Sequence, residues 1–428
     1  MSGNVAPFAS GLELKTYRDW NGVCQWHTLV FYNNGFSWWI KVSLQGKVPD
    51  FISSLGYLKR RSAFQGFLRA IDFRQLQLLD DTRSNIVLTM TDKTDNIIPM
   101  QEDLHHENIY VAIVHRMRFE IMEDNDRVIY PPTYQVQGLR SFDAGCLQDP
   151  EMIAPAVSTI TLNHQKFIYK TIDRPIYESR DTKDIINEIN ALAQFRGAPN
   201  IAQLVGLVES ENPYKTSPSR KMPRVITGFL LEYYSRGPLD GITSEDIAVT
   251  DHLRILWAIQ VGKALELLHS KGRPHLDIKP SNVVLDKEQN AFLIDIGGSG
   301  CYTWEWLSPE MQVFIEENPE KTPVNACMDI QVATDCWAYG KLLSFIATNY
   351  SPGGTISDEL RVAGDNLTKL KPETRTTLSD TLSILNELFL HDPRKKSIGT
   401  GVDIISEQST NSLLTRSEQE GQAWETCF

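Results

Sequence analysis

The stretch between His275 and Asp295 restricts the possible folds more than any other part of this chain. It reads HLDIKPSN, then the apolar run VVLD, then the turn-like KEQN, and then the second apolar run AFLID. Short apolar runs bounded by polar turns predict two short strands. The pattern therefore predicts that Asp277, before the first strand, and Asp295, at the end of the second, lie at neighbouring loop ends.

The polar groups of this stretch suit phosphoryl transfer better than a metal cage. Only His275 is a good nitrogen ligand, and no cysteine stands nearby. Phosphoryl transfer requires a carboxylate that meets the incoming hydroxyl, oxygen ligands for magnesium, and positive charge beside the transferring phosphate. Asp277 is the candidate for the first role, Asn282 and Asp295 for the second, and Lys279 for the third.

The residues upstream predict alternating strands and helices. The run QKFIYKTI is typical of a strand, and TKDIINEINALAQF is typical of a helix with Thr182 as its cap. The run VITGFLLEYY predicts a second, buried strand. A long helix is expected over DHLRILWAIQVGKALELLHSKG, with apolar residues at three- and four-residue steps and a stop at Gly272.

Seven segments of the chain, in the right order, resemble the protein-kinase family. FIYK places Lys170 where the family has its nucleotide-binding lysine, and Glu188 stands where the family has the glutamate that pairs with this lysine. LLEYY resembles the hinge that binds adenine through backbone groups, which indicates Glu232 and Tyr234. The other matches are HLDIKPSN with the catalytic loop, DIG with the magnesium motif, SPE with the end of the activation segment, and DCWAYG with the helix that anchors the large lobe.

The resemblance implies an α+β, bilobal kinase fold, with a five-stranded sheet and one key helix in the small lobe and a mainly helical large lobe. It implies ATP and Mg²⁺ as cofactors and protein substrates. The lysine two positions after the catalytic aspartate is similar to the serine/threonine branch. The roles it implies are catalysis for Asp277 and Lys279, nucleotide binding for Lys170, Glu188, Glu232 and Tyr234, and nucleotide and metal binding for Asn282 and Asp295. The alternative is that Asp277, Asn282 and Lys170 are ordinary loop and strand residues. It requires that seven family-like fragments occur in the right order by chance.

A separate α+β domain is expected before the kinase-like part, because its strand-like runs TLVFYN, SWWIKVSL, NIVLTM and IYVAIV flank a helical stretch. Its tryptophans, Trp20, Trp26, Trp38 and Trp39, are interpreted as core rather than as a ligand surface. The pair His105-His106 is interpreted as a polar turn rather than a metal site. The expected domains are residues 1–135, a linker at 136–150, a kinase-like domain at 151–400 with lobes at 151–235 and 236–400, and a polar tail at 401–428.

The overall composition bears on partners and location. A formal net charge of −12 argues against a nucleic-acid partner, which normally requires a basic face. No run of 18 or more apolar residues predicts a membrane span, and the first residues lack the features of a signal peptide. Six scattered cysteines without a CxxC pair fit a reducing compartment. We expect an intracellular protein, cytoplasmic or nuclear.

Several departures from the family pattern bear on activity. The segment IAPAVSTITLNHQ, before the lysine strand, has no glycine where a glycine-rich loop should cover the phosphates. Ile168 replaces a small residue above adenine, Leu276 replaces the arginine before the catalytic aspartate, and Ile296 replaces the phenylalanine after the metal aspartate. Lys396 stands where an arginine is expected to pair with Glu310.

Two hypotheses follow from these departures. One is an active kinase, and the alternative is a pseudokinase that acts as a binding or scaffold module. The first is favoured because every catalytic polar group is retained together.

The activation segment predicts how activity is controlled. Between Asp295 and Glu310 it contains Ser299, Tyr302 and Thr303 but no lysine or arginine, and the usual phosphate-binding arginine is Leu276. We expect that replacing these three hydroxyl residues leaves most of the activity intact. Regulation is then expected from the N-terminal domain.

Overall fold

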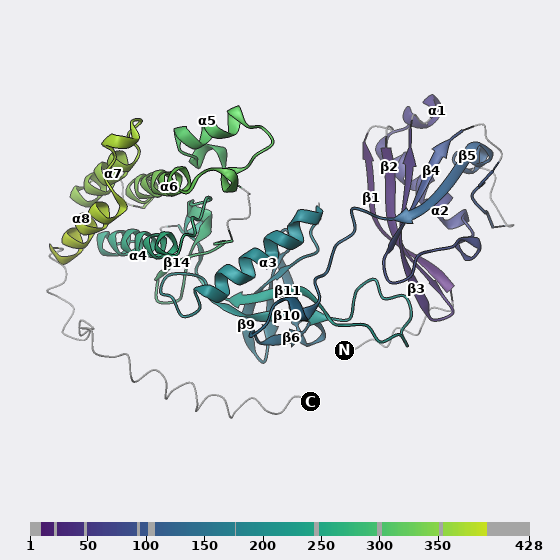
Figure 1. The fold of residues 1–428 in the computed structure, drawn as a ribbon, viewed down its shortest axis with the longest axis horizontal. Coiled ribbons are helices and arrows are strands. Elements are labelled where there is room, and N and C mark those ends of the chain that lie inside the picture. Colours follow the sequence, from purple (N-terminus) through teal and green to yellow (C-terminus); the bar gives the residue numbers. More distant parts are fainter. Residues whose placement is uncertain are drawn as a thin grey trace.

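The computed structural model describes residues 10–391, except for 21–23, 47–48, 92–94, 102–107, 176, 244–247, 298–301 and 351–353. Figure 1 shows three parts in a row, an N-terminal domain, a small lobe and a large lobe. The expected pair His105-His106, Lys396 and the tail at 401–428 lie outside the described residues. No helix within the described ranges is long and apolar enough to cross a membrane.

The N-terminal domain is a five-stranded sheet with strand order β1-β2-β3-β4-β5, in which only β3 and β4 run parallel. Helix α2 connects these parallel strands and packs its Phe64, Phe67 and Leu68 against Leu29 and Ile40 of the sheet, all fully buried. The elements are β1 (Ser10–Trp20), β2 (Cys24–Asn33), β3 (Phe36–Gln45), α1 (Asp50–Ser53), α2 (Tyr57–Ala70), β4 (Arg83–Met90) and β5 (Met117–Glu123).

The interpretation of the tryptophans as core was wrong for the exposed Trp20, whereas the partly buried Trp38 packs against the core cluster of this domain. Trp20 is 76% exposed, and Trp26, Trp38 and Trp39 are half-buried. Trp39 instead packs edge-on against Tyr214 of the small lobe, with ring centroids 5.8 Å apart. The indole therefore serves the contact between domains.

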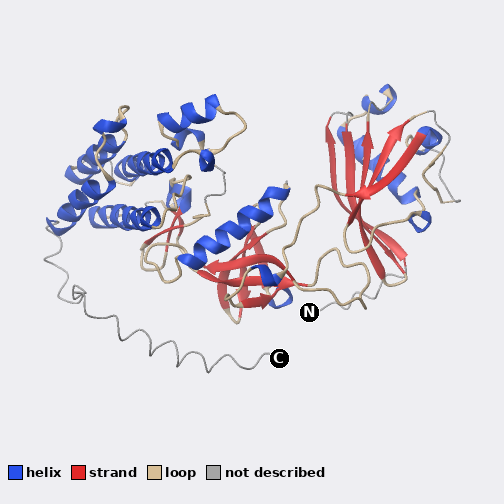
Figure 2. Ribbon diagram, viewed as in Figure 1, coloured by secondary structure: helices blue, strands red, loops and turns tan. Residues whose placement is uncertain are grey.

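The small lobe is built on a six-stranded sheet with order β6-β10-β11-β9-β8-β7, one strand more than expected. The additional strand, β6, pairs in parallel with β10 and comes from the segment that was expected to be a linker. Figure 2 shows one long helix, α3, lying across this sheet. The elements are β6 (Ser141–Asp143), β7 (Gln148–Ala154), β8 (Val157–Leu162), β9 (Gln165–Thr171), α3 (Ser179–Gln194), β10 (Leu204–Ser210) and β11 (Val225–Glu232).

Helix α3 forms because its apolar residues repeat on one face, where Ile185, Ile189 and Leu192 are buried against the lobe core. Its cap is Glu178, whose side chain forms a capping box with Asp181, rather than Thr182 as expected. Thr182 lies within the first turns of the helix, so its hydroxyl is available for a different contact.

The large lobe is mainly helical, and the mixed α+β class and bilobal architecture expected from the sequence are confirmed. The fully buried Leu265 and Trp257 of α4 and Leu342 of α6 belong to one core cluster that continues into the small lobe. The elements are β12 (Gly237–Pro238), α4 (Asp251–Ser270), β13 (Val283–Leu285), β14 (Ala291–Leu293), α5 (Pro309–Glu317), α6 (Met328–Asn349), α7 (Thr355–Leu367) and α8 (Leu378–His391).

Candidate active site

A lysine from the small-lobe sheet bridges two carboxylates from different elements. Lys170 lies on β9, and its Nζ is 2.6 Å from Glu188 Oε1 on α3. The same ammonium contacts the Asp295 carboxylate, which follows β14 of the large lobe. The close approach of α3 to this loop requires glycine at 297, because a Cβ there would stand 2.7 Å from the Glu188 Cβ. Two lobes are thereby joined by one cation.

The charges of this triad shift one another's pKa values. Burial alone lowers the pKa of Lys170, but the two adjacent carboxylates outweigh it and raise that pKa above its ordinary value. Burial raises the pKa of Glu188, with Lys170 acting in the opposite direction. For Asp295, desolvation raises the pKa, but the charge of Lys170 prevails and holds it below the ordinary range. Lys170 and Asp295 are therefore both charged at neutral pH.

The catalytic-loop residues gather around the Asp277 carboxylate. Lys279 Nζ donates to Asp277 Oδ2 at 2.6 Å, and Asn282 Nδ2 donates to the same oxygen at 3.0 Å and to the Asp277 carbonyl at 2.7 Å. Strands β13 and β14 pair antiparallel just beyond the loop, and Ile294 N–H donates to the Asn282 carbonyl at 3.0 Å. This pairing brings Asp295 beside Asn282.

Thr303 of the activation segment joins the same cluster, and the sequence analysis missed it. Its hydroxyl accepts from Lys279 Nζ at 3.0 Å and donates to Asp277 Oδ1 at 3.2 Å. The expectation that Thr303 is dispensable is therefore withdrawn. The sequence does place hydroxyl residues a few positions after the magnesium motif. Only the folded chain shows which of them contacts Asp277 and Lys279. Ser299 lies outside the described residues.

The catalytic loop is held by a buried carboxylate of α6. Asp335 is fully buried, and its two oxygens accept the backbone N–H groups of His275 and Leu276, both at 2.7 Å. These bonds hold Leu276 at φ 68°, a left-handed conformation that a leucine rarely adopts. His275 Nδ1 accepts from Asp277 N–H at 3.2 Å, so Nε2 carries the proton that is donated to the Ile294 carbonyl at 2.8 Å. The ring thus joins both halves of the site.

Oxygen atoms of Asn282 and Asp295 form a donor set that suits magnesium. The Asn282 amide nitrogen is turned toward Asp277, which leaves its oxygen for a ligand, and Lys170 occupies only one oxygen of Asp295. Magnesium prefers such hard oxygen ligands and is usually held by one or two carboxylates together with substrate phosphates. Among the described residues there is no cluster of three or more His, Cys, Asp or Glu that would cage a metal without a nucleotide.

The hinge residues Tyr234 and Glu232 are held by contacts to neighbouring segments. Tyr234 is buried, with its ring 4.5 Å from that of Phe292 and its hydroxyl accepting from Gln203 N–H at 3.2 Å. This side chain therefore supports the joint between the lobes instead of facing a nucleotide. Glu232 ends β11 with an exposed side chain, and its own N–H donates to the Gln203 carbonyl at 3.1 Å.

The hairpin above the site has no glycine-rich loop. Strands β7 and β8 are joined by a tight turn at Pro155 and Ala156, and Ala156 adopts φ 62°. The Ala156 carbonyl accepts from Thr171 N–H at 2.9 Å, which ties the turn to the lysine strand. Ile168 is half-buried between Thr159 and Leu231 in the sheet register. The segment without glycine and the large Ile168, both noted in the sequence, thus lie in a well-paired sheet.

Among the described residues, Glu310 pairs with Arg375. Arg375 Nη1 and Nη2 donate to the two Glu310 oxygens at 2.5 and 2.9 Å, and the guanidinium also lies 4.9 Å from the Trp337 ring centre. The family's bidentate arginine pair is therefore retained, and the substitution inferred from DPRKKS was wrong. The arginine was missed because it stands upstream of that motif, before α8.

Leu276 fills the place of the usual arginine with apolar contacts. It is 5% exposed and forms a cluster with Leu307, Met311 and Ile315, against which Tyr302 packs. At position 276, the contact between the catalytic loop and the activation segment is thus apolar burial instead of an ion pair.

The comparisons with known proteins agree with this geometry. The family model for the protein kinase domain matches residues 156–399, which is more than half of the chain. The chain is 26% identical over 202 residues to 3-phosphoinositide-dependent protein kinase B of Dictyostelium discoideum, covering 44% of this chain and 19% of that protein. It is also 26% identical over 182 residues to maternal embryonic leucine zipper kinase of Xenopus tropicalis, covering 39% of this chain and 26% of that protein. The similarity thus spans about a quarter or less of these relatives. The chain belongs to the protein kinase family.

Proposed function

We propose that this chain is an active, ATP- and Mg²⁺-dependent protein kinase that phosphorylates serine and threonine hydroxyls of protein substrates. The observation that carries the proposal is the Lys170 ammonium, which contacts Glu188 and Asp295 at once. A kinase requires the lysine–glutamate pair and the metal-binding aspartate to be in place together. The ion contacts thus match the arrangement needed for phosphoryl transfer.

The protein's own groups have distinct parts in the proposed reaction. Asp277 orients the substrate hydroxyl and accepts its proton, while Lys279 places positive charge beside the transferring phosphoryl group. Lys170 binds nucleotide phosphates and is itself oriented by Glu188. Asn282 and Asp295 are the residues that would hold the metal, which supplies charge neutralisation of the phosphates when bound.

Serine/threonine preference is proposed from the position of Lys279, two residues after the base. Its ammonium is held by Asp277 and Thr303, so the cation is fixed next to the place where a short aliphatic hydroxyl must approach. Another relative, of Dictyostelium discoideum and 26% identical over 229 residues, bears the name probable serine/threonine-protein kinase. An intracellular location is also proposed, supported by free Cys24, Cys146, Cys327 and Cys336.

A pseudokinase is the second candidate, and the hairpin between β7 and β8 favours it. Its tight turn offers no row of glycine N–H groups to the phosphates, and Ile168 is larger than the usual residue above adenine. The chain would then serve as a binding or scaffold module with weak or no nucleotide turnover.

Thermal unfolding with nucleotide distinguishes the two candidates. A ligand at about 100 times its dissociation constant adds about 2.7 kcal/mol of stability. We expect the melting temperature to rise with Mg-ATP, to rise less with ATP plus chelator, and to rise less again in Asp295→Asn. Absence of any shift at millimolar Mg-ATP, together with absence of phosphate transfer to a generic protein substrate, would refute the active-kinase proposal.

A further inference from the structure

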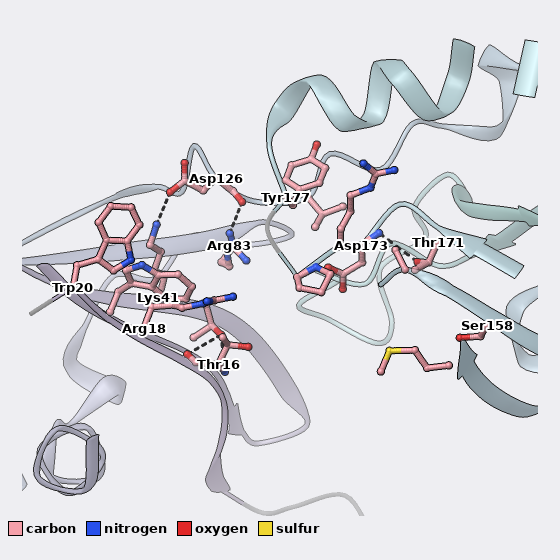
Figure 3. A pocket seen from close by; sticks show the side chains of 17 residues that line it. Thr16, Arg18, Trp20, Lys41, Arg83, Asp126, Ser158, Thr171, Asp173 and Tyr177 are labelled. Carbon is pink, nitrogen blue, oxygen red and sulfur yellow. Dashed lines mark hydrogen bonds and ion pairs between the residues drawn. The ribbon is translucent and has the colours of Figure 1, made fainter. Parts of the chain in front are cut away.

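The segment that leaves the N-terminal domain is first fixed to that domain's own sheet. Asp124 is 1% exposed and accepts from Lys41 Nζ at 3.3 Å and from Arg83 Nε at 2.5 Å. Asp126 continues this attachment, with its carboxylate 2.6 Å from Lys41 Nζ and its carbonyl 2.6 Å from Arg83 Nη2, as Figure 3 shows. Residues 124–127 therefore move with the N-terminal sheet.

Two residues further on, the same segment closes a ring of hydrogen bonds with the small lobe. Ile129 N–H donates to the Tyr177 hydroxyl at 3.0 Å, and the Thr182 hydroxyl donates to the Ile129 carbonyl at 2.6 Å. The Thr182 proton is thus used, so the 2.8 Å contact between Tyr177 and Thr182 has Tyr177 as its donor. Each hydroxyl donates once and accepts once, so the three residues close a ring of hydrogen bonds at the protein surface.

The ring holds the connection that carries both members of the lysine–glutamate pair. Tyr177 lies after β9, the strand of Lys170, and Thr182 lies on α3, the helix of Glu188. Val128, the residue before Ile129, is 5% exposed and donates its N–H to the Tyr214 hydroxyl at 3.0 Å. This contact anchors the segment in the kinase core. Ile129 is therefore bonded directly to α3 through Thr182.

A cleft separates the two domains beside this ring. It encloses about 600 Å³ between one face of the N-terminal sheet and the small lobe, with Trp20, Arg18 and Tyr177 among its lining residues (Figure 3). The domains meet again where Asp81 N–H donates to Thr216 Oγ1 at 2.8 Å and Asp81 Oδ1 accepts from Thr216 N–H at 3.0 Å. The two domains thus touch through these polar contacts and through the packing of Trp39 on Tyr214, around an open space.

We propose that the N-terminal domain positions α3 through the ring formed by Ile129, Tyr177 and Thr182, and so keeps Glu188 against Lys170. Thr182 and Tyr177 are positioning residues, which act on the site through α3 without touching a reacting group. The consequence for activity rests on the proposed kinase function, whereas the consequence for the order of α3 does not.

The test compares four single variants and one double variant of the full chain. Thr182→Val and Tyr177→Phe each open the ring with little change in shape, whereas Thr182→Ser keeps the hydroxyl. Thr348→Val is the matched control, because Thr348 also lies in a helix and donates its hydroxyl to a main-chain carbonyl, that of Ser344, at 2.9 Å. Hydrogen exchange of the α3 amides is measured without nucleotide, and kcat and KM for ATP are measured separately.

Removal of one neutral hydrogen bond should speed exchange of the α3 amides about 3- to 10-fold in Thr182→Val and in Tyr177→Phe. The Thr182→Val, Tyr177→Phe double variant should exceed either single variant only slightly, because the ring is already open. Thr182→Ser and Thr348→Val should behave like the wild type. In an active protein, kcat/KM for ATP should fall by a similar factor in the two ring variants.

Unchanged exchange of α3 in both ring variants would overturn the proposal. Equal acceleration in Thr348→Val would overturn it as well, since the effect would then reflect general loosening. If the α3 amides exchange faster in the two ring variants but the wild-type protein transfers no phosphate, the positioning role stands. That result would count against the proposed kinase function instead.

Discussion

Thr303→Val is the most informative single change in the candidate site. Valine has nearly the shape of threonine but neither accepts from Lys279 nor donates to Asp277, the two contacts measured at 3.0 and 3.2 Å. Both partners are charged and mostly shielded, with side chains 16% exposed for Asp277 and 25% for Lys279. A hydrogen bond to a charged group contributes about 1.5–3 kcal/mol. If that contribution orients the base in the transition state, kcat should fall about 10- to 150-fold.

The assay is steady-state phosphorylation of a protein substrate with ATP varied. KM for ATP should remain within about 2-fold of wild type, because a group that acts only in the transition state changes kcat and not substrate binding. Thr303→Ser should keep most of the activity, and Tyr302→Phe is the control for a neighbouring residue of the same segment. A Thr303→Val protein with wild-type kcat would refute the reasoning, as would a loss confined to KM for ATP.

Three further predictions concern the same site. Asp277→Asn should lower turnover by about 10²- to 10⁴-fold with nearly unchanged nucleotide affinity, measured by kinetics and nucleotide titration; a variant as active as wild type would indicate a contaminating kinase. Phosphatase treatment, and the Ser299→Ala, Tyr302→Phe variant, should leave most activity, because the apolar cluster of Leu276 offers a phosphate no compensating charge; loss of activity with a phosphate mapped to either residue would contradict this. Because the pKa of Asp295 is lowered in the folded protein, the native state binds fewer protons than the unfolded state at acidic pH. The contribution of the Asp295 carboxylate to the free energy of unfolding is therefore present above about pH 3.9 and is lost as the pH falls further. Chemical denaturation should therefore show the stability difference between wild type and Asp295→Asn shrinking as the pH falls from about 5 to about 2, and a difference independent of pH would contradict the shift.

Much of the site could be predicted because its residues are local in sequence. Asp277, Lys279 and Asn282 share one loop, and short strands fix the spacing to Asp295, so chain order alone places these groups together. Lys170 was predicted differently, from the resemblance of FIYK to the strand that carries the family's nucleotide-binding lysine.

The missed contacts are those in which tertiary structure chooses one of several similar side chains. Thr303 and Tyr302 are equivalent hydroxyl residues in the sequence, and only the path of the segment directs the first to Asp277. Arg375 reaches Glu310 across 65 positions, a distance over which no local pattern operates. Thr182 satisfied the cap preference, but the capping box at Glu178 already met the helix N–H groups.

The contacts of Asp335 make the catalytic loop a product of large-lobe folding. The two N–H groups that it accepts lie 59 and 60 positions earlier in the chain, and α6 supplies their only acceptor among the described residues. The left-handed Leu276 conformation is unfavourable without that acceptor, so the loop cannot take its shape before α6 has docked. The backbone amides of His275 and Leu276 should consequently exchange with solvent only when the whole large lobe unfolds. The catalytic loop then keeps its conformation for as long as the large lobe is folded.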